Sequence, residues 1–544
     1  LSFTTRDLAS YDCYDANHNG FAGYEVERGD YQVELKRDAH TLDDCAHVSA
    51  TYHVDHDIRY ETDATTGAAV TNRFTGDVAE AGISIDGVTT GAGIRYLTRA
   101  DFKGSFPQTR DVDRPMSNAV QIFNRYDAGL ATAQDAAASR GASVGSEASG
   151  PDDVTREGDA SPTADADEAA PAASGLASAY ALTSNGALTP LGRELGEDYN
   201  DPRWSPLLDR LGQSEMERFV LHGYSNSGAL EGVSKPRTKD LDGSSQAASF
   251  NQLRYGTGFP SPTVLAQTWD TQLARRYGRA VGMECAMLGI DGWYAPACNL
   301  HRSPVGGRNY EYYSEDPLVS GEMAAQTILG SKETGTFCYL KHMVLNEQDS
   351  YRDSLYTWLT EQSLRELYLE PFRIAVEEGG ATGMMSSYNR IGAIWTGGSR
   401  ALLTEVLRGE WGFRGSVITD YSDHHSYMNA DEMLRAGGSL YMDGVFRDGS
   451  FRFGTDSPNF RACLRRATKD VIYAWLNARA ANLAYNDAAL QAGTATIDRP
   501  LKHRGVSPVL VGISVVDAVA ALCVAVKAHR VLRRRARKKG HAGE

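Results

Sequence analysis

The chain has 544 residues, 42% of them hydrophobic, which is enough for one large domain of roughly 250 to 300 residues plus smaller pieces. Its formal net charge of −15 and its pI near 5.4 exclude a broad basic surface of the kind that binds nucleic acid, except at the last residues. Neutral or small molecules fit better as substrates.

The seven cysteines are scattered, and none forms the C-x-x-C pair that is typical of zinc or redox sites. We therefore expect most of them to be buried thiols, and we expect neither a metal nor an organic cofactor. A bridge between Cys13 and Cys45 stays open, because the sequence does not tell whether their Cα atoms lie close enough for a disulfide.

Residues 1–85 are expected to form a small antiparallel β-sandwich. Apolar side chains occur at every second position, as in strands with one buried face, and a turn at Arg28–Asp30 separates two such runs. The alternating residues are Tyr24, Val26, Tyr31, Val33, Leu35, Val54, Ile58 and Tyr60.

Residues 131–184 consist mainly of Ala, Ser, Gly, Asp, Glu, Pro and Thr. Few large apolar side chains are present to offset the entropy that ordering such a segment costs. We expect a disordered insertion or linker.

Residues 190–485 alternate between short apolar runs and amphipathic helices. The runs include TFCYL, TGMMSS and SVIT, each followed by polar residues. Thr360 is a candidate N-cap for the helix between the first two runs. The helix before the third run has one apolar stripe, formed by Leu402, Leu403, Val406 and Leu407. Repeated strand and helix units of this kind predict a parallel (β/α)8 barrel.

Residues 506–526 are mostly apolar and would span about 31 Å as a helix, close to the thickness of a bilayer core. Asp517 in the middle would cost about 2.5–3.5 kcal/mol in lipid, so an amphipathic core helix is the alternative. Because apolar residues cover all faces, we favour a membrane helix, with the basic residues 527–544 as a cytoplasmic tail.

This topology would place the larger part of a single-pass protein outside the cell membrane. An exported N-terminal part needs a signal, and the opening LSFTTRDLASYDCYD contains none. We therefore expect that a segment of the protein upstream of Leu1 is missing from this chain.

Six polar residues stand just past the ends of the predicted barrel strands. Since the carboxyl ends of parallel barrel strands meet at one mouth, we expect these side chains to lie together. They are Asp242, Arg308, Lys341, His342, Tyr388 and Asp420. A single strand-end Asp is more often a helix cap or an ion-pair partner than a catalytic group. The placement of all six residues at strand ends is what favours a functional site.

Asp420 suits the role of a nucleophile, because it follows the rigid run SVIT. Arg308 and Lys341 are expected to keep its carboxylate ionised. The same two cations, with His342, can donate hydrogen bonds to hydroxyl groups, and Asp242 can accept them.

Aromatic residues complete the candidate site. Tyr388 is expected to hydrogen-bond the nucleophile. Tyr421 and Trp395 are candidates for packing on the apolar face of a ring-shaped ligand.

Five stretches of sequence carry these residues in a fixed order. They are LDGSS with Asp242, YAPACNLHRSPVGGRNYEYYSEDP with Arg308, LKHMVLNEQ with Lys341 and His342, MMSSYNRI with Tyr388, and LRGEWGFRGSVITDYSD with Asp420. Together they resemble glycoside hydrolase family 3 over about residues 206–484.

The resemblance implies a retaining, exo-acting β-glycosidase of the β-glucosidase type that hydrolyses glycosidic bonds at non-reducing ends. Asp420 would form the glycosyl-enzyme intermediate, and the other five residues would bind a β-linked oligosaccharide or glycoside. Two alternatives stay open: a β-xylosidase or arabinosidase, and a carbohydrate-binding surface protein without catalysis.

The segment FAGYEVERGDYQVELKRDAH resembles the fibronectin type III-like domain of the same family. Here it precedes the barrel, as in members with permuted domain order, which begin with an α/β sandwich domain. The general acid/base of the family is usually a Glu of that sandwich domain. The resemblance therefore implies an acid/base upstream of Leu1 and an isolated chain that lacks it.

The chain departs from the family pattern at two positions. Ser244 stands where Asp-Gly-Pro has its proline, and Tyr421 stands where a Trp often follows the nucleophile; both leave the substrate open. The run NEQDSYRDS lacks the Asp-x-His acid/base of the hexosaminidase branch, which excludes that branch.

Overall fold

The computed structural model describes residues 4–36, 48–74, 177–248, 256–392, 394–422, 427–443, 453, 456–491 and 527. The chain divides into two compact units, Leu1–Ala488 and Ala489–Glu544. The first unit contains every strand described below.

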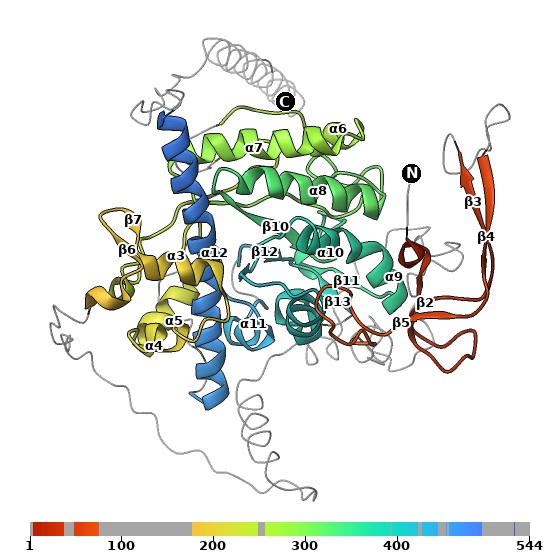
Figure 1. The fold of residues 1–544 in the computed structure, drawn as a ribbon, viewed down its shortest axis with the longest axis horizontal. Helices are drawn as coiled ribbons and strands as arrows, with labels where there is room; N and C mark the ends of the chain where they lie inside the picture. Colours follow the sequence, from red (N-terminus) through yellow and green to blue (C-terminus); the bar gives the residue numbers. More distant parts are fainter. Residues whose placement is uncertain are drawn as a thin grey trace, which may run out of the picture. The chain divides into compact units, whose positions relative to one another are not determined.

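The N-terminal residues form antiparallel strands. Strands β1 (Ser10–Asp12), β2 (Gly23–Val26) and β5 (Ile58–Tyr60) make a three-stranded sheet, and β3 (Gly29–Leu35) pairs with β4 (Val48–Val54) in a hairpin (Figure 1). All the residues predicted to alternate lie in these strands, so the strand prediction is confirmed. The fibronectin type III-like sandwich over residues 1–85 stays a prediction.

A five-stranded parallel sheet lies at the centre of the remaining residues. Its strands follow the order β15-β12-β10-β9-β8, and each pair of neighbours is parallel. All seven residues of β10 are buried, as expected for a strand with both faces covered. The bounds are Asp240–Leu241 (β8), Gly292–Trp293 (β9), Phe337–Met343 (β10), Gly383–Ser386 (β12) and Ser416–Ile418 (β15).

Two irregular segments join the edges of this sheet into a ring. The N–H of Thr419, next to β15, donates to Leu440 O (3.0 Å), and the N–H of Tyr441 donates to Val220 O (2.8 Å). The N–H of Asp240 in β8 then donates to Ser225 O (2.9 Å). The prediction of an α/β barrel is confirmed in outline. The expected eight regular strands are not what the described residues show, because residues 220–227 and 439–442 pair irregularly.

Long helices cover the sheet, and α7 (Thr271–Leu288) and α8 (Pro317–Lys332) lie side by side (Figure 1). Short polar side chains begin these helices: the carboxylates of Asp270 and Asp316 accept hydrogen bonds from first-turn N–H groups. Thr360 caps α9 (Glu361–Ser363) in the same way, as predicted. The predicted apolar stripe of η8 (Ala401–Glu410) is fully buried.

Of the remaining helical segments, η1 contacts the N-terminal strand β2, and the others surround the parallel sheet or lie in its connections. Their bounds are η1 Thr5–Leu8, η3 Ala177–Tyr180, α3 Pro190–Glu197, α4 Trp204–Leu208, α5 Gln213–Leu221, η4 Glu231–Val233, α6 Pro262–Ala266, η5 Arg352–Ser354, η6 Leu364–Tyr368, α10 Glu370–Glu377, η7 Thr396–Gly398, α11 Ala430–Ala436 and α12 Pro458–Gln491. Short strands are β6 Thr183–Ser184, β7 Ala187–Leu188, β11 Tyr356–Thr357, β13 Arg390–Ile391 and β14 Ile394–Trp395.

The end of the predicted disordered insertion is ordered. Residues 177–184 contain η3 and β6, and Leu182 is fully buried in the core. The insertion therefore ends earlier than residue 184, because Leu182 packs against the barrel although its neighbours in the sequence are small and polar. Residues 131–176 lie outside the described part of the chain.

Among the described residues, no helix is long and apolar enough to cross a membrane. The predicted span 506–526 and its basic tail, apart from Lys527, lie outside those residues. Cys45 does too, so its bridge to Cys13 is untested. Cys285, Cys298 and Cys338 are buried free thiols, as predicted, while Cys13 is buried and Cys463 is partly exposed.

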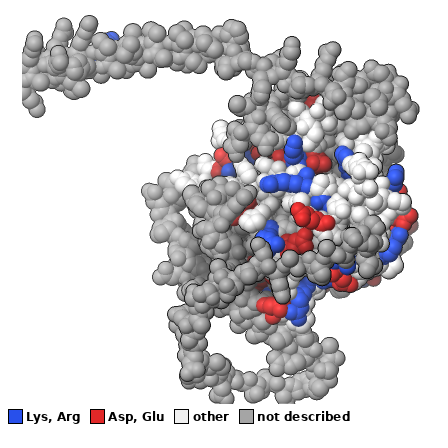
Figure 2. Space-filling model, turned by 90° about the vertical axis from the view of Figure 1, so that its left-hand side faces the viewer, with Lys and Arg blue, Asp and Glu red and all other residues white. Residues whose placement is uncertain are grey.

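One face of the molecule shows how its charges are distributed. In Figure 2, Lys and Arg side chains on the described part of this face are interspersed with Asp and Glu side chains. Such mixing weakens any long-range field of one sign.

Candidate active site

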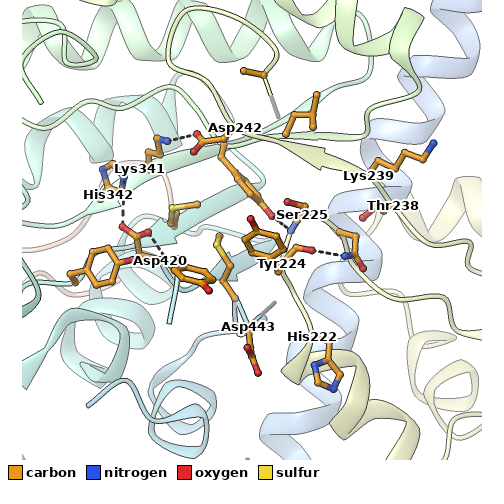
Figure 3. Close-up of a pocket in the computed structure, with 18 of the residues that line it drawn as sticks. His222, Tyr224, Ser225, Thr238, Lys239, Asp242, Lys341, His342, Asp420 and Asp443 are labelled. Atoms are coloured by element: carbon orange, nitrogen blue, oxygen red, sulfur yellow. Dashed lines mark hydrogen bonds and ion pairs between the residues drawn. The ribbon is translucent and has the colours of Figure 1, made fainter. Parts of the chain in front are cut away.

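The strand ends bring all six candidate residues to one pocket. Asp242 follows β8, Arg308 lies in the loop after β9, Lys341 and His342 end β10, Tyr388 follows β12, and Asp420 follows β15. They line a pocket of about 630 Å³, called the main pocket below (Figure 3). Their joint placement is as predicted, whereas their chemical roles stay predictions.

Lys341 and Asp242 form an ion pair at this pocket. The Lys341 ammonium lies 2.8 Å from Asp242 Oδ1 and 3.9 Å from Glu311 Oε2. Although burial disfavours the charge of Lys341, the two carboxylates raise its pKa above the usual value. The surrounding protein likewise disfavours the charge of Asp242, but Lys341 holds the pKa of that carboxyl below its usual value. Both groups are therefore charged at neutral pH.

Arg308 is held by two partners and has one free end. Its Nε donates to Glu311, and its Nη2 lies 3.0 Å from His342 Nε2. Its Nη1 is buried and has no hydrogen-bond partner among the described residues. A buried donor without a partner costs about 1–3 kcal/mol, which a bound hydroxyl group would recover.

His342 is neutral in this surrounding. Burial, together with the positive charges of Arg308 and Lys341, lowers its pKa well below the usual value. Since arginine can only donate, His342 Nε2 accepts from Arg308 and the ring proton lies on Nδ1. Asn299 fixes the backbone of His342: its Oδ1 accepts from the His342 N–H (2.8 Å), and its Nδ2 donates to the His342 carbonyl (3.0 Å).

The carboxylate of Asp420 has one engaged oxygen and one unengaged oxygen. Oδ1 accepts from the Tyr421 N–H at 2.7 Å. Oδ2 is buried, accepts no hydrogen bond from the described residues, and lies 3.7 Å from His342 Nε2. An unengaged oxygen at the end of a rigid strand is available to a ligand in the pocket.

Burial raises the pKa of Asp420 above its usual value, and the positive charges of Arg308, Arg352 and Lys341 only partly oppose this rise. We expected the cations to dominate, and the direction is the opposite. The reason is that the desolvation of a carboxylate in the barrel outweighs the attraction of nearby charges.

The aromatic residues divide into two groups. Tyr388 and Tyr421 line the main pocket, and the guanidinium of Arg352 stacks over the Tyr388 ring at 4.7 Å. Trp395 does not line it: the residue is 3% exposed, and its Nε1 donates to Ser387 O. The prediction that Trp395 contacts a ligand is therefore wrong, because its indole is part of the core. The hydrogen bond from Tyr388 to Asp420 stays a prediction.

Sequence reasoning missed several residues that line the main pocket. Arg352 lies ten residues beyond His342, in the run NEQDSYRDS. Asp443 follows the apolar run SLYM and shows the same strand-end signal that identified Asp420. Residues 222, 224–226 and 237–239 also line the pocket, but their irregular pairing leaves no periodic signal in the sequence.

About half of the residues that line the main pocket lie in a range that matches a known family. Residues 246–442 match the family model described as the glycosyl hydrolase family 3 N terminal domain. The chain carries this family 3 domain. All the candidate residues lie inside the matched range except Asp242, which precedes it by four residues.

Beta-glucosidases resemble this family 3 domain. Beta-glucosidase B of Emericella nidulans is 37% identical over 217 residues, which are 40% of this chain and 25% of that protein. A beta-glucosidase of Rhizobium radiobacter is 39% identical over 223 residues, 40% of this chain and 27% of that protein. The chain thus spans about a quarter of the length of these relatives.

Solved beta-glucosidases also resemble it. The structure of beta-glucosidase 3B from Thermotoga neapolitana in complex with glucose is 29% identical in sequence and superposes with a TM-score of 0.46. The likeness covers 54% of this chain and 46% of that one.

Proposed function

We propose that this chain is the barrel part of a retaining, exo-acting β-glycosidase of the β-glucosidase type, with Asp420 as its nucleophile. The observation that carries the proposal is the unengaged, buried Oδ2 of Asp420, a residue that lines a pocket whose other groups suit a sugar. The similarity of the family 3 domain to beta-glucosidases supports the same reaction.

The fixed polar groups would orient the sugar. The charged pair of Lys341 and Asp242 offers a donor and an acceptor, and Arg308 Nη1 offers a second donor. Charge-assisted hydrogen bonds of this kind are roughly twice as strong as neutral ones. They would hold the anomeric carbon within reach of Asp420 Oδ2.

The reaction would proceed in two displacements. Oδ2 of Asp420 forms a bond to the anomeric carbon while the bond to the leaving oxygen breaks, and that oxygen takes the electron pair and a proton from a general acid. Water, losing a proton to the same group, then attacks the anomeric carbon and releases the sugar and the Asp420 carboxylate.

We propose that the general acid/base is a carboxyl group from outside the main pocket as described. In retaining glycosidases the two carboxyl groups lie about 5–5.5 Å apart, facing the same bond. Besides the proposed nucleophile Asp420 and Asp242, which pairs with Lys341, Asp443 is the remaining carboxylate that lines the main pocket. Figure 3 shows its side chain directed away from Asp420. The family resemblance supports a Glu of a further domain for this role.

Covalent trapping tests the nucleophile in the chain as it stands. The reagent is a dinitrophenyl β-glucoside in which fluorine replaces the hydroxyl next to the anomeric carbon. Fluorine slows both displacements, while the good leaving group departs without a general acid, so the intermediate accumulates. We expect mass spectrometry to show one fluoroglucosyl group on the peptide that contains Asp420.

Two variants control this experiment. Asp420→Asn should take no label, and Asp443→Asn should be labelled like the unchanged chain. Label on another residue would contradict the assignment. If the corresponding fluorinated dinitrophenyl β-xyloside labels the chain faster than the glucoside, a β-xylosidase is favoured. If the chain binds glucose but takes no label, the non-catalytic carbohydrate-binding alternative is favoured.

A further inference from the structure

A second hollow adjoins the main pocket. It has a volume of about 280 Å³, is called the side pocket here, and shares His222, Asn226 and Arg237 with the lining of the main pocket. Helix α5 supplies its other wall through Arg218 and Phe219. A ligand larger than one sugar can therefore extend from the main pocket past Arg237.

Arg237 is oriented but not neutralised. Its Nε donates to Asn226 Oδ1 at 2.9 Å, and the amide of Asn226 is in turn held by Tyr224 O. No carboxylate of the described residues lies within ion-pair distance of its guanidinium, which is exposed. The fork of a guanidinium matches the oxygens of a carboxylate or a phosphate, so a fixed, free arginine is suited to bind such a group.

The charges around the side pocket favour an anion. Arg218 and Arg237 line it, with Glu215 as its acidic member, and Lys239 lines the main pocket two residues beyond Arg237. The three carboxylates of the main pocket, Asp242, Asp420 and Asp443, do not line the side pocket. A positive balance therefore remains where the two pockets meet.

The side pocket adjoins the end of the main pocket that lies opposite Asp420. In Figure 3, Asp420 lies with Lys341 and His342 at one end of the main pocket, and Thr238 and Lys239 lie at the opposite end. A sugar that places its anomeric carbon at Asp420 would direct its leaving group toward Arg237, which flanks Thr238. We propose that Arg237 selects β-glycosides whose leaving group carries a carboxylate or a phosphate. This inference rests on the proposed function.

Matched glucosides test the proposal by binding, which does not require the acid/base. The probes are phenyl β-glucosides with a carboxylate, a phosphate or a neutral carboxamide in the para position. Titration calorimetry of the full chain at low salt should give about five-fold tighter binding for an anionic probe than for the carboxamide. The difference should shrink as salt is added. Comparing the carboxylate with the phosphate tells which anion is preferred.

Three variants complete the experiment. Arg237→Gln should abolish the preference by weakening the binding of the anionic probes, and Arg237→Lys should keep part of the preference. Arg276→Gln, which changes an exposed arginine on α7, should keep all of it. Equal binding of all probes, or a preference that survives Arg237→Gln, would overturn the inference and leave the proposed function standing. Binding of no glucoside would overturn both.

Discussion

At the scale of single residues, the chemistry of the site depends on whether Asp420 is ionised. A nucleophilic carboxylate must have lost its proton, and burial raises the pKa of Asp420 above its usual value while Arg308 and Arg352 oppose the rise. Removing one of these positive charges should therefore raise the pKa of Asp420 further, so that its carboxyl group holds its proton to a higher pH.

The rate of fluoroglucosyl labelling should rise with pH as Asp420 ionises, with a midpoint above the ordinary value of 3.8. Replacing Arg352 by Gln should move this midpoint upward, since the positive charge of Arg352 opposes the rise in the pKa of Asp420. The measurement is the labelling rate against pH. Arg400→Gln, an exposed change on another part of the barrel, should leave the midpoint in place, and a downward shift with Arg352→Gln would contradict the electrostatic account.

At the scale of elements, a buried ion cluster ties the N-terminal strands to the barrel helices. Arg365 in η6 lies 2.8 Å from Glu361 of α9 and 2.8 Å from Glu410 of η8. The backbone N–H of Arg73 donates to Glu361, and its side chain pairs with Glu410 at 3.0 Å. The segment after β5 is thus held by charges that the barrel helices bury.

Removing Arg365 should destabilise the protein strongly. Arg365→Met leaves the buried carboxylates of Glu361 and Glu410 without their shared partner, which should cost about 3–5 kcal/mol of unfolding free energy. Arg373→Met on neighbouring α10 is the matched control: its partners Glu370 and Glu377 are more exposed, so about 1 kcal/mol or less is expected. Urea denaturation measures both, and equal losses would refute the distinction between the clusters.

At the scale of the whole molecule, we propose that residues 506–526 anchor the protein in a membrane, with residues 527–544 on the cytoplasmic side. When membranes are washed with alkaline carbonate, the full chain should then stay in the membrane fraction, whereas a chain that ends at residue 491 should be released into solution. The double substitution Ile513→Arg and Val516→Arg should also release it, since each charge at mid-span costs about 2.5–3.5 kcal/mol. Release of the unchanged chain would end this proposal.

Much of the fold and site was predictable because the relevant signals are local. Alternation at Tyr24 and Val26 marks a strand, Thr360 can cap a helix with its own hydroxyl, and a polar residue after an apolar run marks the end of a barrel strand. The same rule placed Asp242 and Asp420 in one pocket although 178 positions separate their numbers in the sequence.

The predictions that were wrong concern side chains whose burial depends on contacts with segments distant in sequence. Leu182 sits among small and polar residues and is nevertheless buried, and Trp395 lies beside the site in sequence but packs into the core. Neither outcome follows from neighbours in the chain, because burial is decided by segments that are distant in sequence.

Local signals in the sequence are enough to predict the parallel strands, the order of the motifs and the residues that meet at the strand ends, because each depends on local periodicity and on the direction of the chain. Three properties become visible only in the folded chain: the irregular closure of the ring through residues 220–227, the raised pKa of Asp420, and the guanidinium of Arg237 beside the side pocket. These properties arise from desolvation and from contacts between distant segments, which no single stretch of sequence contains.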